Sequence, residues 1–295
     1  MNDGSSAAPG LPSPGQQADV LEVRGITVRF GGLTALDAVS LTAPPRQVTG
    51  IIGPNGAGKT TLLNVLCGFV RPDSGDLSLG GTPMTGLAPH RLASLGIART
   101  LQGVGLFQGL TVLENVMAGA TCHARAGFWP GLLGLVRSDR DERALRQRSL
   151  AALDQVGVAD QAGRLPDQLA YGLRKRVALA RALVAGPRVL LLDEPASGLS
   201  EAELPGLGEL ITQLAADASV VVVEHRMDLM MSVCQAIAVL DFGKLIAHGT
   251  PEEVQADPAV TAAYLGTEDP GTEDPGTEHP GTGGKGGGTG EPADG

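Results

Sequence analysis

Two kinds of hydrophobic pattern along the chain predict strands. Residues 21–30 and 35–43 alternate apolar and polar side chains, as strands with one exposed face do. Residues 47–53, 188–193 and 219–225 are short, nearly continuous apolar runs, which are typical of strands buried on both faces. The first pair predicts an antiparallel layer, and the three runs predict the centre of a mostly parallel sheet.

Helical patterns separate the buried runs, so the expected fold class is α/β, with crossover helices between parallel strands. Residues 89–183 contain few strand signals and several helical ones. They predict a helical subdomain inserted between the first two buried strands. Residues 237–249 predict a hairpin that turns at Asp241–Lys244.

Both ends of the chain differ in composition from the central domain, residues 20–265. Residues 1–19 are rich in Pro, Gly and Ser, which predicts disorder. Residues 266–282 repeat the unit Gly-Thr-Glu-Asp-Pro with small changes, and a Gly-rich end follows. Because every repeat contains both Pro and Gly, helix and sheet are excluded. We interpret residues 266–295 as a solvated acidic tail; a partner-binding tail or a metal site at His279 are the alternatives.

Charge and apolar runs exclude several classes of protein. The net charge of the 295 residues is −10, but most of the excess acid lies in the two tails, so the central domain is nearly neutral. A nucleic-acid binder would show a basic face, and we therefore expect no nucleic-acid partner. No apolar run predicts a membrane span or a signal peptide, so we expect a soluble, cytosolic chain. The scattered Cys67, Cys122 and Cys234 are interpreted as reduced core thiols.

The segment Gly53–Thr60, "GPNGAGKT", has the spacing of a phosphate-binding P-loop and lies between a buried strand and a helical run. Its glycines allow backbone N–H groups to converge on phosphate oxygens, and the helix that follows adds a partial positive charge. Lys59 provides a full charge for the β- and γ-phosphates. We expect Thr60 to bind Mg²⁺ and Thr61 to reach the α-phosphate region. The complete predicted loop is Gly53, Pro54, Asn55, Gly56, Ala57, Gly58, Lys59, Thr60 and Thr61.

Two further buried runs end in residues that can act on the γ-phosphate. In "VLLLDEP", Asp193 can hold Mg²⁺ through water, and Glu194 can polarise a water that attacks the γ-phosphate. His225 ends the run "SVVVVEH" and can hydrogen-bond the γ-phosphate and that water. A structural histidine at a strand end is the alternative for His225.

The P-loop, "LAYGLRKRVALARAL", "LLLDEPASGLS" and "VVVEH" together resemble the ATP-binding subunits of ABC transporters, over about residues 20–265. The resemblance implies the ABC type of P-loop NTPase fold and ATP hydrolysis coupled to transport. It also identifies Gln102 as the Q-loop glutamine that joins the metal site to the membrane partner. Phe30 stands where the family has an adenine-stacking aromatic residue; a core phenylalanine at a strand end is the alternative.

The family's signature sequence corresponds here to Leu169, Ala170, Tyr171, Gly172 and Leu173. In the family these residues begin a helix whose N-terminus points at the γ-phosphate held by the opposite subunit. Ala170 lacks the usual serine hydroxyl, Leu173 replaces the expected glutamine, and Ser200 stands where Asp is frequent. A second interpretation follows, in which one of the two composite ATP sites is weak.

"GIARTLQGVGLFQGLTVLENV", the apolar insert "GFWPGLLGLVRS" and the ending "GTPEEVQADPAVTAAYLG" resemble the branched-chain amino acid uptake branch. Urea and amide uptake ATPases share much of this pattern and are an alternative. The resemblance implies a second ATP-binding subunit, identical or different, two transmembrane permeases, and an external solute-binding protein, with this chain on the cytoplasmic face of the membrane. A soluble ABC-type ATPase of translation or DNA repair and a non-hydrolysing regulatory module are further alternatives.

Overall fold

The computed structural model describes residues 20–100, 103–120 and 136–265. The expectations for the two tails, for Gln102 and for most of the apolar insert at 127–138 lie outside these residues.

An antiparallel sheet forms one layer of the described structure. It contains β1 (Leu21–Phe30), β2 (Leu33–Ala43), β4 (Ser74–Leu79) and β5 (Thr82–Pro83), in the order β2-β1-β4-β5. β1 pairs with both β2 and β4, so it is an inner strand of this layer. The two alternating sequence patterns therefore predicted an antiparallel layer correctly.

A second, mostly parallel sheet carries the three buried apolar runs. Its order is β10-β9-β3-β8-β7-β6, where β3 is Val48–Ile52, β6 is Ile97–Arg99, β7 is Val189–Asp193, β8 is Ser219–Val223, β9 is Ala236–Asp241 and β10 is Lys244–Gly249. β9, β3, β8, β7 and β6 run parallel to one another. β10 is antiparallel to β9, which confirms the predicted hairpin with its turn between Asp241 and Lys244.

Both faces of this second sheet are covered. Leu190 and Leu192 of β7 belong to one apolar cluster, which includes residues of α6 and α7. Val189 and Leu191, on the other face, belong to a second cluster, which includes residues of α1 and of the antiparallel sheet. Because successive side chains of a strand point to opposite faces, one continuous apolar run serves both cores.

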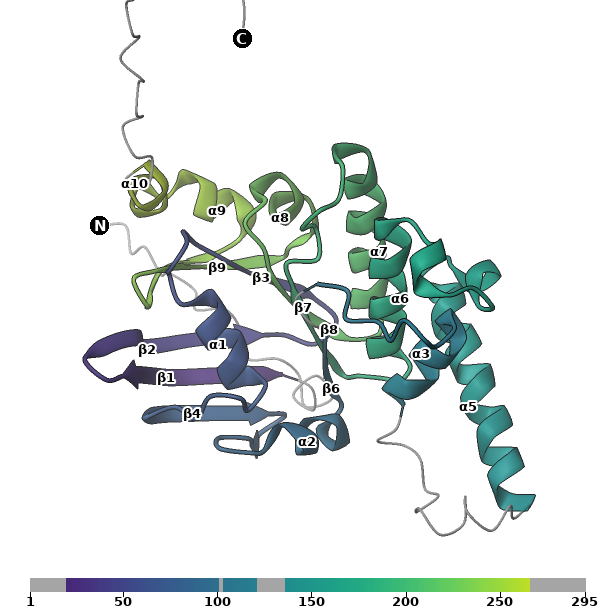
Figure 1. The fold of residues 1–295 in the computed structure, drawn as a ribbon. Helices are drawn as coiled ribbons and strands as arrows, with labels where there is room; N and C mark the ends of the chain where they lie inside the picture. Colours follow the sequence, from purple (N-terminus) through teal and green to yellow (C-terminus); the bar gives the residue numbers. More distant parts are fainter. Residues whose placement is uncertain (1–19, 101–102, 121–135, 266–295) are drawn as a thin grey trace, which may run out of the picture.

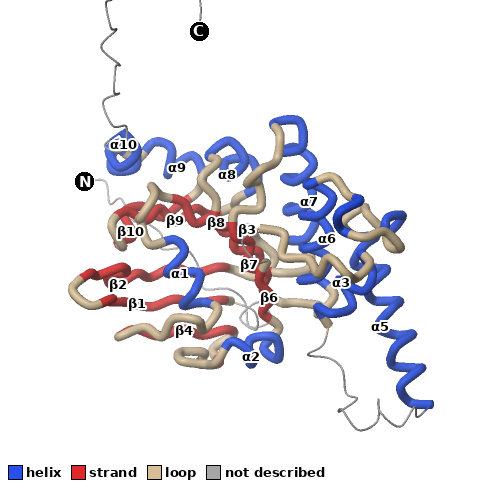
Figure 2. Tube along the Cα trace, in the orientation of Figure 1, coloured by secondary structure: helices blue, strands red, loops and turns tan. Residues whose placement is uncertain are grey.

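The helices surround the six-stranded sheet and extend away from it on one side (Figure 1). Helix α1 lies between the two sheets, and α3, α5 and α6 form a group at the far side from the antiparallel layer (Figure 2). The bounds are α1 Lys59–Leu66, α2 Pro89–Leu92, α3 Val112–Gly119, α5 Val136–Gln155, α6 Tyr171–Leu183, α7 Leu204–Ala215, α8 Met227–Val233, α9 Pro251–Ala256 and α10 Pro258–Leu265.

The range 89–183, which the sequence pattern predicted to be helical, also contains a short strand. Residues 97–99, inside the expected helical range 89–183, form β6 and pair in parallel with β7. A three-residue strand at a sheet edge is too short for its apolar pattern to be distinguished from a helix. The first helix of the group, α3, begins after Thr111, whose hydroxyl and backbone exchange hydrogen bonds with Glu114 in a capping box.

Close packing of α3 against α6 requires a glycine at the end of α3. A Cβ atom on Gly119 would contact the backbone oxygen of Arg181 and would lie 2.8 Å from its Cγ atom. We therefore expect Gly119→Ala to destabilise the chain by about 1–3 kcal/mol through overpacking. This loss exceeds the gain of about 1 kcal/mol that alanine brings to a helix. Urea unfolding followed by circular dichroism measures the difference.

Gly163→Ala is the matched control for this substitution. Gly163 does not have positive φ, and no heavy atom lies within 4 Å of a Cβ built on it. We expect its unfolding free energy to stay within about 0.5 kcal/mol of the original chain. Equal effects of the two substitutions would contradict the close α3–α6 contact.

Candidate nucleotide-binding site

Three adjacent parallel strands deliver the predicted phosphate-binding residues to one edge of the sheet. β8 lies between β3 and β7, and its last residue, Val223, pairs with both Ile51 and Asp193. The P-loop follows β3, Glu194 follows β7, and His225 comes two residues after the end of β8. In open α/β sheets, ligands bind at the carboxyl ends of the strands.

The P-loop adopts a backbone that its glycines allow. Gly53, Gly56 and Gly58 have φ angles of +150°, +81° and +99°. A Cβ atom on Gly53 would contact the backbone oxygen of Leu240, and one on Gly58 would lie 2.7 Å from that of Ala35. Gly53 and Gly58 therefore need both the backbone freedom of glycine and the absence of a side chain.

Lys59 begins helix α1 and folds back over the loop. Its Nζ atom donates hydrogen bonds to the backbone oxygens of Gly53 at 2.6 Å and Pro54 at 2.8 Å. Burial lowers the pKa of Lys59, and the carboxylates of Glu194 and Glu224 oppose that lowering. The lysine is thus a desolvated cation held at the phosphate-binding loop.

A hollow of about 480 Å³ opens beside the P-loop. Its polar wall is formed by the loop and Glu194, and its apolar rim includes Phe30, Leu33 and Phe242. Phe30 is 52% exposed, which argues against a core role for its ring. Sequence reasoning did not identify Leu33 or Phe242, because the hairpin turn that carries Phe242 shows no binding pattern. The lining residues are Phe30, Leu33, Thr34, Ala35, Asn55, Gly56, Ala57, Gly58, Lys59, Thr60, Thr61, Glu194, Phe242 and Gly243.

Asp193 is buried and engaged by a residue that sequence reasoning missed. Arg99, the last residue of β6, donates from Nη2 to Asp193 Oδ2 at 2.8 Å and from Nη1 to Asn64 Oδ1 at 2.8 Å. The Arg99 and Asp193 side chains are 15% and 3% exposed. One guanidinium therefore connects β6, helix α1 and β7 at the edge where nucleotide is expected. No local sequence signal predicts this pair, since its partners lie far apart along the chain.

Thr60 and Asp193 have the oxygen ligands that Mg²⁺ prefers, although Asp193 does not line the hollow and its Oδ2 accepts from Arg99. Thr60 places a hydroxyl group in the hollow, and Asp193 provides a carboxylate at the end of β7. Mg²⁺ in nucleotide sites usually takes few protein oxygens and completes its shell with phosphates and water. Among the described residues, no group of three or more His, Cys, Asp or Glu side chains could form a metal cage of its own. Gln102, the remaining predicted ligand, lies outside the described residues.

His225 is positioned by its neighbour in the sequence. Its Nδ1 atom lies 3.0 Å from Oε1 of Glu224, whose side chain is fully buried. The His225 side chain itself is 59% exposed and is not part of the hollow's lining. Glu224 is a second residue that sequence reasoning missed, because a carboxylate inside an apolar run gives no indication of its partners.

The signature residues lie away from the P-loop hollow. Ala170 is the N-cap of α6, and no side-chain hydrogen bond caps this helix. Leu169 is only 4% exposed, so its side chain belongs to the core. Ala170, Gly172 and Leu173 line a different hollow of about 330 Å³ between α6 and α7. None of the signature residues lines the P-loop hollow of the same chain.

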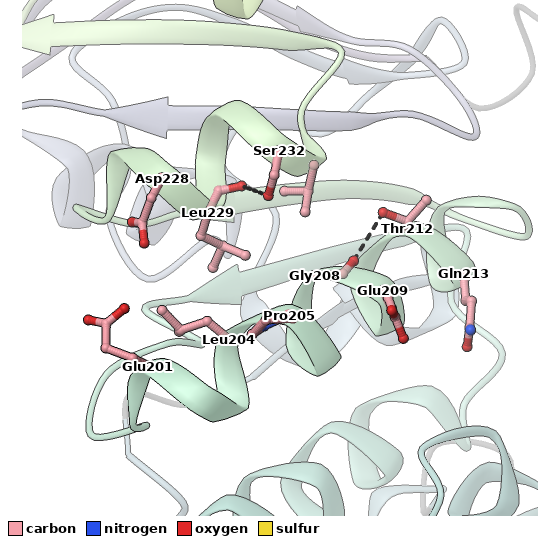
Figure 3. Close-up of a pocket in the computed structure, with 11 residues that line it drawn as sticks. Glu201, Leu204, Pro205, Gly208, Glu209, Thr212, Gln213, Asp228, Leu229 and Ser232 are labelled. Atoms are coloured by element: carbon pink, nitrogen blue, oxygen red, sulfur yellow. Dashed lines mark hydrogen bonds between the residues drawn. The ribbon is translucent and has the colours of Figure 1, made fainter.

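A larger hollow, of about 700 Å³, lies elsewhere, between α7 and α8. Leu204 and Leu229 form apolar walls, and the carboxylates of Glu201 and Asp228 stand at one end (Figure 3). It contains no phosphate-binding or metal-binding pattern from the sequence.

Comparison with known proteins agrees with this geometry. A family model described as "ABC transporter" matches residues 36–197, and one described as "Branched-chain amino acid ATP-binding cassette transporter" matches residues 244–270. The fold resembles the crystal structure of the ADP conformation of MJ1267, an ATP-binding cassette of an ABC transporter. The TM-score is 0.73 at 30% sequence identity, over 84% of this chain and 99% of that one.

The chain therefore belongs to the ABC transporter family, and the predicted ABC type of α/β fold is confirmed. Its similarity extends to one branch. It is 41% identical over 249 residues to the high-affinity branched-chain amino acid transport ATP-binding protein BraF of Pseudomonas aeruginosa, covering 84% of this chain and 98% of BraF. It is 38% identical over 249 residues to LivG of Escherichia coli K12, the corresponding high-affinity protein, with the same two coverages.

The buried Arg99–Asp193 pair leads to a stability prediction. Arg99→Met keeps most of the side-chain stem but leaves the Asp193 carboxylate without its cation. Breaking a buried pair by removing one partner typically costs about 3–5 kcal/mol. We expect a loss near the lower end, because Arg99 is not completely buried. Urea unfolding of the nucleotide-free chain measures it.

Arg24→Met provides the control, because Arg24 also pairs with a carboxylate, Glu22, at 2.8 Å but is 70% exposed. Exposed pairs contribute about 0–1 kcal/mol. If Arg99→Met cost no more than Arg24→Met, the described pair would not stabilise the strand ends.

Proposed function

We propose that this chain binds and hydrolyses ATP as the energy-coupling subunit of an ABC importer for branched-chain amino acids. One observation carries the ATPase proposal: the P-loop and Glu194 line the same hollow at the carboxyl ends of β3 and β7. A phosphate-binding loop and a carboxylate that can polarise water are the two groups that hydrolysis needs.

Each predicted residue has a defined role in this proposal. The N–H groups of the P-loop and the N-terminus of α1 bind the phosphates. When ATP binds, Lys59 gives up its hydrogen bonds to the backbone oxygens of Gly53 and Pro54 and contacts the β- and γ-phosphates instead. Thr60, Asp193 and Gln102 hold Mg²⁺, which neutralises charge on the phosphates. Glu194 polarises the attacking water, and His225 contacts that water and the γ-phosphate. Phe30, at the rim, stacks on adenine.

The position of α6 supports a composite site shared by two subunits. Its signature end does not face the P-loop of its own chain, and its N-terminal N–H groups have no side-chain cap. Such an N-terminus stabilises an anion, and we propose that the anion is the γ-phosphate bound to a second ATP-binding subunit. Because Ala170 has no hydroxyl, this half-site binds the phosphate through backbone alone.

The proposed importer adds two transmembrane permeases and an external solute-binding protein. Among the described residues, no helix is long and apolar enough to cross a membrane. We place the chain as a peripheral subunit on the cytoplasmic face of the membrane. Branched-chain amino acids are favoured by the match at residues 244–270 and by the similarity to BraF and LivG. Co-purification with the permeases, followed by uptake of labelled leucine and urea into vesicles, separates this solute from the urea alternative.

Glu194→Gln tests the hydrolytic role directly. The amide keeps the shape of the carboxylate but cannot take up a proton, and removing a general base lowers kcat by about 10²–10⁴-fold. We expect ATP affinity to change less than about threefold, since the P-loop is unaltered. The assay is ATP hydrolysis by the assembled transporter, together with equilibrium ATP binding.

Glu209→Gln on the exposed side of α7 is the control and should retain normal turnover. Near-normal ATPase activity in Glu194→Gln would show that another group activates the water and would contradict the proposed function.

A further inference from the structure

The backbone around Glu194 is held in an unfavourable conformation. Glu194 has φ +46°, in the left-handed region that residues with a side chain rarely adopt. Its N–H group donates to Val223 O at 2.8 Å, and its own carbonyl accepts from Ser197 N at 3.1 Å. Such conformations persist where several surrounding contacts determine them. The contacts on residues 194–196 therefore show what keeps the Glu194 carboxylate in the hollow.

Lys175 holds this segment from the side of α6. Its Nζ atom donates to the backbone oxygens of Glu194 at 3.2 Å and Pro195 at 2.8 Å. Burial lowers the pKa of Lys175, and the nearby carboxylates of Glu224 and Glu194 oppose that lowering. Lys175 is thus a half-buried cation whose two described hydrogen bonds both end on the loop that carries Glu194.

Glu224 holds the same segment from the side of β8. Its side chain is fully buried, and Oε2 accepts a hydrogen bond from Ala196 N at 2.9 Å. Oε1 accepts from His225 N at 2.9 Å and lies 3.0 Å from His225 Nδ1. One carboxylate thus connects the loop after β7 to the histidine after β8. A buried carboxylate with this set of donors fixes the relative position of the groups that it joins.

We propose that Lys175, from α6, and Glu224, after β8, are positioning residues that hold residues 194–196 and thereby fix the direction of the Glu194 carboxylate. The cation binds the carbonyls of the segment, and the anion binds its N–H group. This inference rests on the proposed function only in taking Glu194 as the residue that polarises water. Neither residue lines the hollow beside the P-loop, so both act through the backbone of the segment.

The position of Lys175 gives this arrangement a second consequence. Lys175 lies one turn into α6, and its Nζ atom is 5.6 Å from the centre of the Tyr171 ring at the beginning of that helix. In the proposed dimer, the helix whose N-terminus faces the partner's nucleotide is therefore also the helix that holds the segment carrying Glu194.

Hydrogen exchange of the nucleotide-free full chain tests the holding of the segment without any enzymatic assay. Lys175→Met keeps the apolar stem and removes the three donors, and Glu224→Gln keeps the shape and removes the charge. We expect the amides of Ala196 and Ser197 to exchange at least about tenfold faster in each variant, the effect of losing a charged hydrogen bond. Rates within twofold of the original chain would overturn the proposal.

Turnover by the assembled transporter tests the consequence for catalysis. We expect each variant to lower kcat by about tenfold or more while ATP affinity changes less than about threefold, since Lys59 and the P-loop remain. Lys175→Arg, which keeps a charge and several donors, should restore most of kcat. An unchanged kcat, or a loss of affinity as large as the loss of kcat, would overturn the positioning role.

Controls separate this inference from general damage and from the proposed function. Arg148→Met and Glu209→Gln remove one charge each from exposed positions and should leave exchange and kcat unchanged. If Lys175→Met also exposes the amides of β3, Lys175→Arg decides the matter, because it must keep the original protection at Ala196 and Ser197. If the unaltered transporter does not hydrolyse ATP, the proposed function fails, whereas the exchange rates still decide whether the two charges hold the segment.

Discussion

The site depends on one constraint: parallel strands buried on both faces must all end at the same edge of the sheet. Most side chains of β3, β7 and β8 belong to two apolar clusters on the two faces of the sheet, so these strands are nearly continuous apolar runs. Beyond Ile52, Asp193 and Val223 the chain must turn at once, and its backbone N–H groups become available. The adjacent order β3-β8-β7 therefore places the P-loop, Glu194 and His225 at the same edge of the sheet, although they lie far apart in the sequence.

Several charged side chains lie at this edge of the sheet, and each is near a side chain of opposite charge. Lys59 and Lys175 are desolvated cations whose loss of hydration is opposed by Glu194 and Glu224. Asp193 is likewise a buried charge, and its partner of opposite sign is Arg99. An isolated buried charge would cost several kcal/mol, whereas a paired and hydrogen-bonded one is tolerated. The edge therefore already contains charged groups of both signs beside the P-loop, which suits the charged ligand of the proposed function.

The hydrophobic pattern and the P-loop motif correctly predicted those elements whose conformation depends on residues close together in the sequence. The buried runs around Ile51, Leu191 and Val221, and the P-loop glycines, are contiguous in the sequence, and their spacing alone defines them. The pattern failed at residues 97–99, because a three-residue edge strand is recognised only when β7 lies beside it. The contacts of Arg99, Lys175 and Glu224 could not be predicted either, since each joins segments that only the folded topology brings together. Sequence thus predicted the candidate ligand-binding residues, while the residues that hold them in place required the structure.

The two departures in the signature sequence have different physical meanings. Leu173 is partly buried, packs against the larger apolar cluster and lines the hollow between α6 and α7 together with Leu199 and Leu207. Its apolar side chain therefore packs against residues of its own subunit. Ala170 is exposed at the N-cap of α6, where a side-chain oxygen would be free to accept a hydrogen bond from the helix or from a ligand. Under the proposed composite site, the interpretation of one weak ATP site therefore depends on Ala170 rather than on Leu173, whose side chain packs within its own subunit.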